Sequence, residues 1–485
     1  MSGSIWISEN SVRVLSTSES LAQFDHIFSE LSKRELVRSI DFMVVLPEVS
    51  VKRLKKLQSK AEAAANDAVF TRAVLDFFER LAKWETRGEG GSLSLTIKAD
   101  SHTYTQIDEL VANQTLKNTH NDFKGGIWQV RNLNKYLQFE ADAPPLPEVK
   151  CITMFDFGSI DQPRELHPNV LAAVTNACVR ATRVDWCTGL PQRGAMPKRR
   201  EIRSALARAL QQAKFTSANE IVLRLMDNDP MNEAFELESV LENPDELDSL
   251  SLAVRRVCQL PTLRKLDLDT LWSLSPVAFG AHPALPDLKC PSLEEVIINV
   301  SMTTPDGRYL MTGDPENASY EDGYWNSEAE KSPAPFDSDD SDTSDWQPEF
   351  AWDKLDGEVP PTNFRSTPDP DTFVPLAQSF ARAAFHHMPK LRSMEINFGG
   401  MVRACSSPSE LLYFAPGQPH RRASDYLGDC EKFDKENTQC PRWYFDGTLD
   451  FDSSWRMPQE LKRELEGPDG NGRIYMTVEQ ERIEI

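Results

Sequence analysis

The residues whose types could carry chemistry are few, and they do not cluster in the sequence. His386 and His387 form the one adjacent histidine pair, and a metal or catalytic site there would need further ligands, or a nucleophile with its base. No H-E-x-x-H or H-x-x-x-H pattern accompanies them. Gly399 and Gly400 follow an expected strand, but the glycine patterns of phosphate-binding loops are absent. We therefore expect no catalytic residues, no metal site and no cofactor.

A run of aspartates carries the densest set of oxygen ligands. The run consists of Asp337, Asp339, Asp340, Asp342 and Asp345. An EF-hand loop needs a glycine at its sixth position and a glutamate at its twelfth, and this run contains no glycine. We interpret it as a solvated segment rather than a calcium site.

Three tryptophans lie in the same acidic segment and are candidate partner-binding residues. They are Trp325, Trp346 and Trp352. Disordered acidic segments with spaced aromatic side chains dock into grooves of partner proteins. The alternative is that these side chains fold back onto the chain's own body, and the sequence leaves both interpretations open.

A nine-residue phrase occurs four times in the chain. In each copy an apolar residue precedes Pro, and apolar residues follow that Pro at plus two, plus five and plus seven. The copies are Leu146–Met154, Leu260–Leu268, Cys290–Ile298 and Met388–Ile396. The last two apolar positions have the period of a strand with one buried face, and the plus-two and plus-five residues match the L-x-x-L-x-L core of leucine-rich repeats. The phrase predicts equivalent strands in an architecture that holds a partner.

The residues between these buried positions are the main candidates for partner binding. Alternate residues of a strand point to opposite sides of a sheet, so this second set is expected on the concave, exposed strand face. The set consists of Lys265, Asp267, Asp269, Glu295, Ile297, Asn299, Ser393, Glu395 and Asn397. Their selection depends on expected exposure alone.

Helices are expected ahead of several strands. Phe70, Val74, Phe77 and Leu81 form one apolar stripe of a helix that ends near Trp84. Further helices are expected at 170–178, 202–210, 250–257, 373–384 and 455–465, and strands at 93–97, 221–225, 442–445 and 473–478. A Pro between helix and strand suits this order, because Pro cannot continue the helix and favours an extended residue before it.

A basic run occupies the start of the expected helix at 202–210. It consists of Lys198, Arg199, Arg200 and Arg203. We interpret it as part of the exposed surface of that helix, and a nuclear-localisation signal is the alternative.

One long segment interrupts the repeats. Residues 302–371 hold 18 Asp or Glu, four Lys or Arg and nine Pro, which is a composition typical of disorder. The phrase prolines Pro291 and Pro389 are 98 residues apart, and removing these 70 leaves 28, close to the 30 that separate Pro261 from Pro291. We expect helix–strand repeats at 1–301, a disordered acidic insertion at 302–371, and the last repeat with a C-terminal cap at 372–485.

Bulk composition narrows the class of partner. The chain has 485 residues, of which 40% are hydrophobic, and a net charge of −22. Phosphate repels such a surface, so neither nucleic acid nor a membrane is the expected partner. No apolar run is long enough to span a bilayer and the start lacks a signal peptide, which favours the cytoplasm or nucleus. Eight scattered cysteines form no C-x-x-C pair, and we expect free thiols.

Three segments resemble a family of uncharacterised fungal F-box-like proteins. They are Phe77–Glu85 followed by Leu93–Ile97, Phe385–Ile396, and the aromatic stretch near Trp443 and Phe445. The resemblance covers most of the chain outside the acidic insertion.

The resemblance implies a substrate receptor of a cullin-type ubiquitin ligase. In that family an N-terminal F-box docks on the cullin-ligase adaptor, and the repeat region holds the substrate. Leu46–Val49 has the letters of the F-box opening phrase, but a long helix rich in Lys and Ala follows it. The F-box is therefore expected to be missing or degenerate in this chain.

These observations predict a fold and a kind of role. The expected fold is an α/β, irregular leucine-rich-repeat-like solenoid of helix–strand units with a long disordered acidic insertion. The expected function is non-enzymatic protein binding, as in the substrate-receptor region of an F-box protein. A remnant or scaffold without a ligase role is one alternative, and an unrecognised enzyme is the other.

Overall fold

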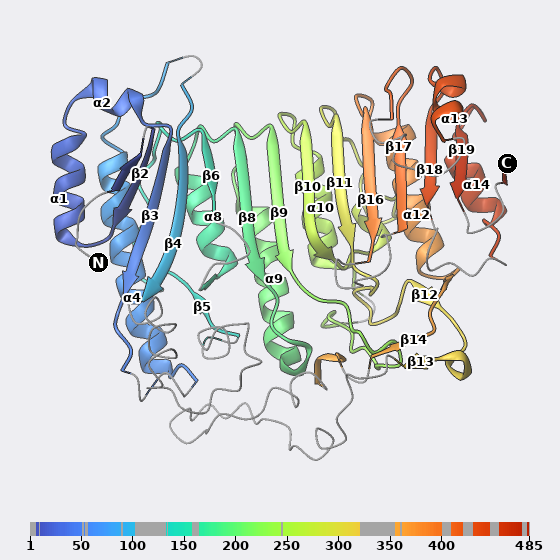
Figure 1. The fold of residues 1–485 in the computed structure, drawn as a ribbon, viewed down its shortest axis with the longest axis horizontal. Helices are drawn as coiled ribbons and strands as arrows, with labels where there is room; N and C mark the ends of the chain where they lie inside the picture. The colour runs from blue at the N-terminus through green and yellow to red at the C-terminus, as the bar shows by residue number, and fades with distance from the viewer. Residues whose placement is uncertain are drawn as a thin grey trace. The chain divides into compact units, whose positions relative to one another are not determined.

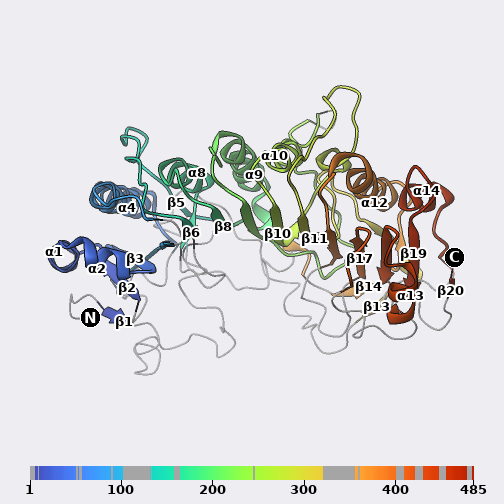
Figure 2. The same cartoon turned by 90° about the horizontal axis from the view of Figure 1, so that it is seen from above.

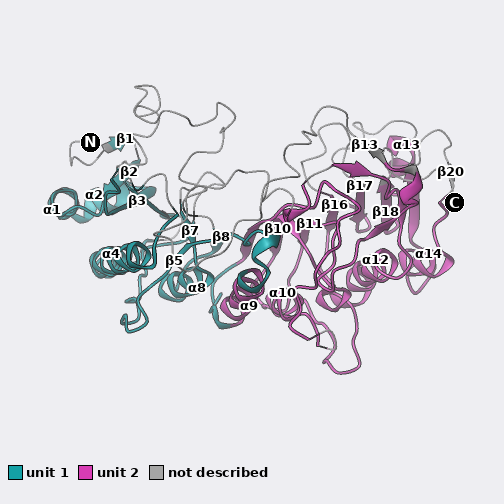
Figure 3. Ribbon diagram, turned by 90° about the horizontal axis from the view of Figure 1, so that it is seen from below, with its two compact units in different colours: residues 1–198, 212–218, 332–352 teal, residues 199–211, 219–331, 353–485 magenta. Residues whose placement is uncertain are grey.

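The computed structural model describes most of the chain as two compact units. The described residues are 6–8, 10–50, 53, 57–88, 91–101, 132, 134–157, 164–243, 246–320, 355–358, 361–399, 409–420, 430–446, 455–477 and 483–484. Unit 1 contains the described residues of 1–198 and 212–218, and unit 2 those of 199–211, 219–331 and 353–485 (Figure 3).

Unit 1 is a sheet covered by helices on one face. Its elements are β1 (Trp6–Ser8), β2 (Ser11–Leu15), α1 (Ser18–Ile27), α2 (Leu31–Leu36), β3 (Ser39–Leu46), α4 (Lys60–Leu81), β4 (Ser94–Ser101), β5 (Tyr136–Leu137), β6 (Met154–Asp156), β7 (Glu165–Leu166), α8 (Pro168–Ala177) and β8 (Arg183–Gly189). The sheet order is β1-β2-β3-β4-β6-β8, and every pairing except β1 with β2 is parallel. Helices α4 and α8 lie on the same face of it (Figure 2).

Unit 2 repeats the order of helix then strand. Its elements are residues 199–211 of α9 (Met196–Gln212), β9 (Glu220–Met226), α10 (Ser249–Cys258), β10 (Lys265–Trp272), β11 (Glu295–Val300), β12 (Met311–Thr312), β13 (Ser319–Tyr320), β14 (Thr362–Asn363), β15 (Thr367–Pro368), α12 (Phe373–Arg382), the π-helical turn η5 (Ala383–His387), β16 (Ser393–Phe398), β17 (Ser409–Phe414), α13 (Cys430–Asn437), β18 (Arg442–Asp446), α14 (Gln459–Glu466), β19 (Arg473–Thr477) and β20 (Ile483–Glu484).

The sheet of unit 2 is parallel at its start and mixed at its end. Strands β9, β10, β11 and β16 pair in parallel and lie side by side (Figure 1). Strands β17 and β18 join antiparallel, β19 joins β18 in parallel, and β20 pairs antiparallel with β19. Helices α10, α12 and α14 lie on one face of this sheet, and α13 lies on the other (Figure 2). The chain is thus a mixed α/β protein with mostly parallel sheet.

Local sequence explains where the helices begin. Ser59 and Glu62 form a capping box at the start of α4, in which each side chain accepts from the backbone N–H of the other residue. The Asp248 carboxylate caps α10 by accepting from the N–H groups of Leu250 and Ser251. The Pro residues of the repeated phrase follow α10 and η5, as expected for a residue that cannot continue a helix.

The repeated phrase forms strands as predicted in three of its four copies. The second, third and fourth copies run into β10, β11 and β16, and their plus-five and plus-seven residues are buried on the helix-covered face. The prediction is wrong at the end of the first copy, where Met154 is half-buried and Phe155 is buried instead. The backbone explains this shift, because the N–H groups of Thr153 and Met154 both donate to the Leu93 carbonyl and β6 begins only at Met154.

The same two-donor contact begins the parallel strands of unit 2. The N–H groups of residues 264 and 265 both donate to the Asn219 carbonyl, at 2.8 and 3.0 Å. Those of residues 294 and 295 donate to the Arg264 carbonyl, and those of residues 392 and 393 to the Glu294 carbonyl. Each strand is therefore aligned with the strand before it at its first residue.

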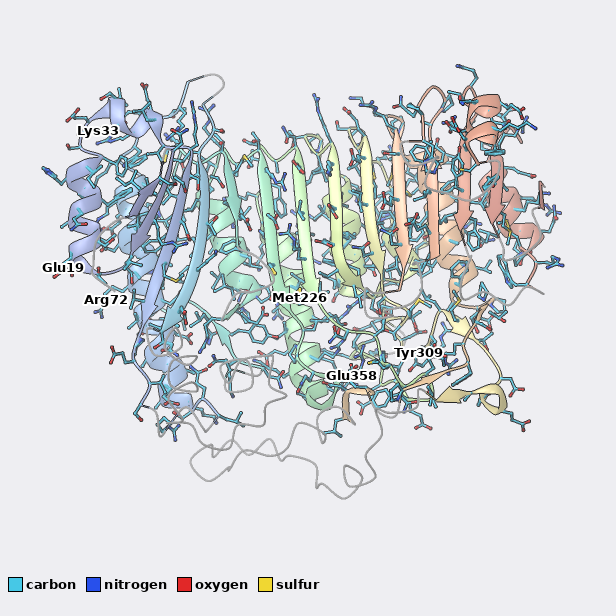
Figure 4. The ribbon with its side chains drawn as sticks, in the orientation of Figure 1. Glu19, Lys33, Arg72, Met226, Tyr309 and Glu358 are labelled. Atoms are coloured by element: carbon cyan, nitrogen blue, oxygen red, sulfur yellow. The ribbon has the colours of Figure 1, made fainter. Side chains whose placement is uncertain are left out.

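The two edges of the acidic insertion are folded, in contrast to the expectation of disorder across 302–371. Strand β12 pairs with β15, and β13 pairs with β14, both antiparallel. The Glu233 carboxylate accepts from the N–H groups of Phe364 and Arg365, and the Arg365 guanidinium lies 4.1 Å from the ring centre of Tyr309. Tyr309 and Glu358 lie beyond the end of β9 that Met226 marks (Figure 4). The sequence analysis used the average composition of the whole segment, which is acidic, and so missed the apolar and aromatic residues at its two ends.

The centre of the insertion lies outside the described residues. This applies to Trp325, Trp346 and Trp352 and to the aspartate run at 337–345. None of the helices in the described ranges has the length and apolar character that crossing a bilayer requires.

We expect Ile298→Ala to destabilise unit 2 far more than Ile297→Ala. Ile298 has no exposed surface on the helix-covered face, whereas the neighbouring Ile297 is half-buried on the opposite face. Removing a fully buried isoleucine side chain costs about 2–5 kcal/mol, because part of the cavity remains unfilled. Urea unfolding followed by circular dichroism measures the difference. Equal effects of the two variants would contradict the assigned burial, and a larger effect of Ile297→Ala would show that β11 has the opposite orientation.

Candidate functional site

The candidate residues of β10, β11 and β16 lie on one face of the sheet of unit 2. Strand register places them in rows that cross the strands, because partners in register point to the same side. The first row is Glu220, Lys265, Glu295 and Ser393, and the second is Val222, Asp267, Ile297 and Glu395. In the third row Arg224 is in register with Asp269, and Asn299 with Asn397. A hydrogen bond from Asn299 Nδ2 to Asp269 Oδ1 joins these two pairs where the register of β10 and β11 shifts. We call these three rows the polar face. Residues on β9 belong to it although the sequence analysis did not select them.

The first row contains one cation between two carboxylates. Lys265 Nζ lies 3.7 Å from Glu220 Oε1 on β9 and 3.4 Å from Glu295 Oε1 on β11. All three side chains are half-buried, so the ammonium group is largely neutralised by its own neighbours.

The third row is a chain of hydrogen bonds across four strands. Arg224 Nε donates to Asp269 Oδ2 at 3.1 Å, and Asn299 Nδ2 donates to Asp269 Oδ1 at 3.2 Å. Asn397 Nδ2 donates to Asn299 Oδ1 at 2.8 Å and to Glu395 Oε1 at 3.3 Å. The linked side chains hold one another in place, which pre-organises this part of the polar face.

The second row holds a carboxylate between two aliphatic residues. Asp267 is in register with Val222 on one side and Ile297 on the other. Burial, followed by the negative charge of Asp269, raises the pKa of Asp267 from 3.8 to about 6. Within the described ranges, no hydrogen bond or ion pair reaches its carboxylate. Asp267 therefore gains or loses its charge near pH 6.

Thr270, which follows Asp269 of the third row, has a strained backbone. Thr270 has φ of +66°, which is unfavourable for a β-branched side chain, and the pairing of β10 with β11 shifts between Leu268 and Trp272. Thr270 Oγ1 donates to the Leu225 carbonyl at 2.5 Å, and its N–H donates to Asp269 Oδ1 at 2.7 Å. These bonds hold the bulge and orient the Asp269 carboxylate toward the third row.

Helix α13 covers the continuation of the polar face over β17, β18 and β19. Leu412, Tyr444 and Tyr475 continue the second row, and they form a buried cluster with Cys430 of α13. Phe433 packs against this cluster, with its ring centre 5.3 Å from that of Tyr475.

A buried ion pair fixes α13 to the sheet. Arg442 has no exposed surface, and its Nε donates to Asp434 Oδ1 at 3.0 Å. Tyr444 Oη donates to the same Asp434 oxygen at 2.6 Å, and the backbone N–H of His420 donates to Oδ2 at 3.3 Å. Burial and the Asp434 carboxylate raise the pKa of Tyr444, so its hydroxyl stays a donor.

The histidine pair and Gly399 are not part of the polar face, and Gly400 lies outside the described residues. His386 and His387 end the π-helical turn η5, and burial followed by the nearby His386 lowers the pKa of His387. Gly399 has φ of +90° directly after β16, and its N–H donates to the Val300 carbonyl of β11, which extends the β11–β16 ladder by one bond. In the described part of the chain, no group of three or more His, Cys, Asp or Glu residues could hold a metal ion, and the seven described cysteines are free thiols.

The basic run at 198–203 is not an exposed helix surface, contrary to our interpretation. Arg199 and Arg203 are buried, and Arg199 Nη2 lies 2.5 Å from Asp227 Oδ2. Arg203 Nη2 donates to Asp248 Oδ2 at 2.8 Å. Their spacing of four residues with apolar neighbours was the available signal, since it places both on the face that Ile202 and Leu206 bury.

Comparisons with known proteins add no relative. No protein-family model, no curated protein and no solved structure matches the chain.

We expect Asp267→Asn to stabilise the protein at neutral pH but not at acid pH. The folded protein keeps the Asp267 proton up to a pKa of about 6, and the unfolded chain releases it near 3.8. Stability from this group is therefore fully present below the lower value and is lost as the pH rises through the upper one. Asparagine cannot ionise, so the variant should be more stable by about 1 kcal/mol above pH 7, after discounting for solvent screening.

Urea midpoints of the two proteins at several pH values measure this difference. Glu316→Gln, which removes an exposed carboxylate of unit 2, is the matched control for loss of charge. A constant difference between Asp267→Asn and the native protein from acid to neutral pH would contradict the assignment.

We expect Asp434→Ala to destabilise the C-terminal part of unit 2 by about 3–5 kcal/mol, because it leaves the Arg442 charge buried without its partner. Lys435→Ala on the same helix removes an exposed pair with Glu431 and should cost about 0.5 kcal/mol or less. Hydrogen exchange of the β18 amides measures both effects. Similar protection in the two variants would argue against this role of Asp434.

Proposed function

We propose that the chain is a non-enzymatic protein-binding module whose contact surface is the polar face. The observation that carries this proposal is the arrangement of three rows of side chains across β9, β10, β11 and β16, all of them half-buried except the buried Val222. The side chains of the third row hold one another in place before any partner arrives, and such pre-organisation lowers the cost of binding. Neighbouring strands supply different residue types at equivalent positions, which is a basis for specificity.

The finer proposal is that the helix–strand units form an irregular leucine-rich-repeat-like solenoid. Three observations support it: β9, β10, β11 and β16 pair in parallel in chain order, a helix precedes most of them, and the repeated phrase occupies equivalent positions in β10, β11 and β16. In repeat proteins of this kind the strand face is a common site for protein partners.

The role proposed by resemblance is that of a substrate receptor in a cullin-type ubiquitin ligase. Leu46 is the last residue of the parallel strand β3, so the letters Leu46–Val49 begin inside a strand, and the 22-residue helix α4 starts at Lys60. The cullin-ligase adaptor would therefore have to bind without an F-box at this position. A scaffold or remnant that binds its partner without a ligase role is the alternative within the same class.

An enzyme is the alternative from a different class. The raised pKa of Asp267 beside Asp269 favours it, because acid–base catalysts often have such shifted values. The engaged side chains around Asp267 favour binding, since Arg224, Asn299 and Lys265 are all held by neighbours in their rows.

We expect a bound protein to be lost when the polar face is blocked. In the test, the full chain is expressed in cells and purified by affinity, and bound proteins are identified by mass spectrometry. The blocking variant is Ile297→Arg with Ser393→Arg, which places two long side chains on the face. The matched control is Gln211→Arg with Thr262→Arg, which adds the same charge at exposed positions off the face.

Each outcome decides between the proposals. A partner that is lost from the blocking variant and kept by the control supports the binding role, and the cullin-ligase adaptor among the recovered proteins supports the ligase role. A face-dependent partner without the adaptor supports a scaffold. Equal recovery from the blocking variant and the native chain, or no recovered protein, would contradict the proposal.

A further inference from the structure

Helix α13 shows how a helix docks on this side of the sheet. It presents Cys430, Phe433 and Asp434 to the strands, which is the spacing of one helical face. The apolar residues pack on Leu412, Tyr444 and Tyr475, and the single charged residue meets a charge of opposite sign on β18. The sheet contributes the cation Arg442, and the helix contributes the anion Asp434.

The charges are reversed on the part of the face that α13 leaves uncovered. The three rows over β9, β10, β11 and β16 contain Glu220, Asp267, Asp269, Glu295 and Glu395 as acids, and Lys265 and Arg224 as bases. Five acids and two bases leave an excess of three negative charges when all ionise. Both bases are already engaged by carboxylates, so an occupant that adds positive charge is favoured.

The spacing of the strands suits a helix in this place. Asp267 and Asp269 are two residues apart on β10, which corresponds to about 6.7 Å, and helix positions i and i+4 are separated by about 6 Å along the axis. A helix about 10 Å wide covers two strands spaced about 4.8 Å apart, here β10 and β11. Ile297 then lies beneath the helix as an apolar contact next to Asp267.

We propose that the polar face over β10 and β11 receives an amphipathic helix of a partner protein that carries Lys or Arg on its docking side, with the Asp267 carboxylate as the anchor. This inference rests on the proposed binding function and specifies the chemistry of the partner. A second copy of the chain does not fit, because two acidic faces repel each other, and the phosphates of nucleic acid are excluded for the same reason.

Binding of such a helix is linked to the protonation of Asp267. The charged groups that face Asp267 are Lys265 and Asp269 on its own strand, Glu220 and Arg224 on β9, and Glu295 and Glu395 on β11 and β16. A cation beside Asp267 favours the ionised carboxylate, so affinity should fall as the pH drops through about 6.

The test measures binding of labelled synthetic peptides to the full chain by fluorescence anisotropy. The probe is an alanine-rich helical peptide of about 15 residues with Leu and two Lys, at positions i and i+4, on one side. One matched peptide has Glu in place of Lys, and a second has the same Lys content with Pro residues that prevent a helix. The proteins are the native chain, Asp267→Asn, and the control Gln211→Arg with Thr262→Arg.

The expected result is that the helical Lys peptide binds and the Glu peptide does not. Asp267→Asn should weaken the Lys peptide about tenfold at neutral pH and remove the pH dependence near pH 6, while the control binds as the native chain does. Circular dichroism of Asp267→Asn excludes loss of fold as the cause. Equal binding of the Lys and Glu peptides, or native affinity in Asp267→Asn, would overturn the proposal, and equal binding of the Pro peptide would overturn its helical part.

This test can fail independently of the proposed function. If Ile297→Arg with Ser393→Arg loses a cellular partner but the Lys peptide does not bind, the polar face is a binding surface for a different chemistry. If neither partner loss nor peptide binding is found, both proposals are wrong.

Discussion

Two backbone N–H groups that share one carbonyl begin each of the strands β10, β11 and β16. This contact sets the register of each strand against the strand before it, and every row of the polar face depends on that register. A slip of one residue would move Leu266 and Leu268 to the open face and Lys265, Asp267 and Asp269 into the core. Burial of the apolar set against the helices opposes such a slip, so the core and the binding surface are determined by the same alignment.

The alternation of side chains in the strands made much of the polar face predictable. The alternation of Leu266, Asp267 and Leu268 predicts a strand with one apolar and one polar face. The repeated phrase predicts that β10, β11 and β16 are equivalent strands. Equivalent positions of the phrase coincide with the register of β10, β11 and β16, but β9 does not carry the phrase, so its register had no signal in the sequence. The structure was therefore needed to place Val222 next to Asp267, and to find the raised pKa of Asp267.

Elements whose sequence lacks a clear period were missed. Strand β8 buries Val184, Asp185 and Trp186 in succession, so it shows no alternation. Helix α13 is short and mostly charged, and the reason for its position is the Arg442 guanidinium on a strand that follows it in the sequence. Buried ion pairs of this kind, like those of Arg199 and Arg203, show in the sequence only as charged residues in an apolar setting, and their partners cannot be read from it.

The two ends of the acidic insertion pair with each other in the β12–β15 and β13–β14 ladders. Ser319 is opposite Asn363 in the β13–β14 ladder, so the chain leaves this ladder and returns to it at one place. The register of β11 and β16 is set by the Glu294 carbonyl and the N–H groups of residues 392 and 393, so it does not depend on the number of residues between 320 and 355. Residues 355–358 do not belong to that stretch, because Asp356 is buried and the Gly357 carbonyl accepts from the Asn232 N–H. Natural variants of this protein should therefore accept insertions, deletions and drift in composition between 320 and 355, while a single residue added within β10 or β11 would be eliminated by selection.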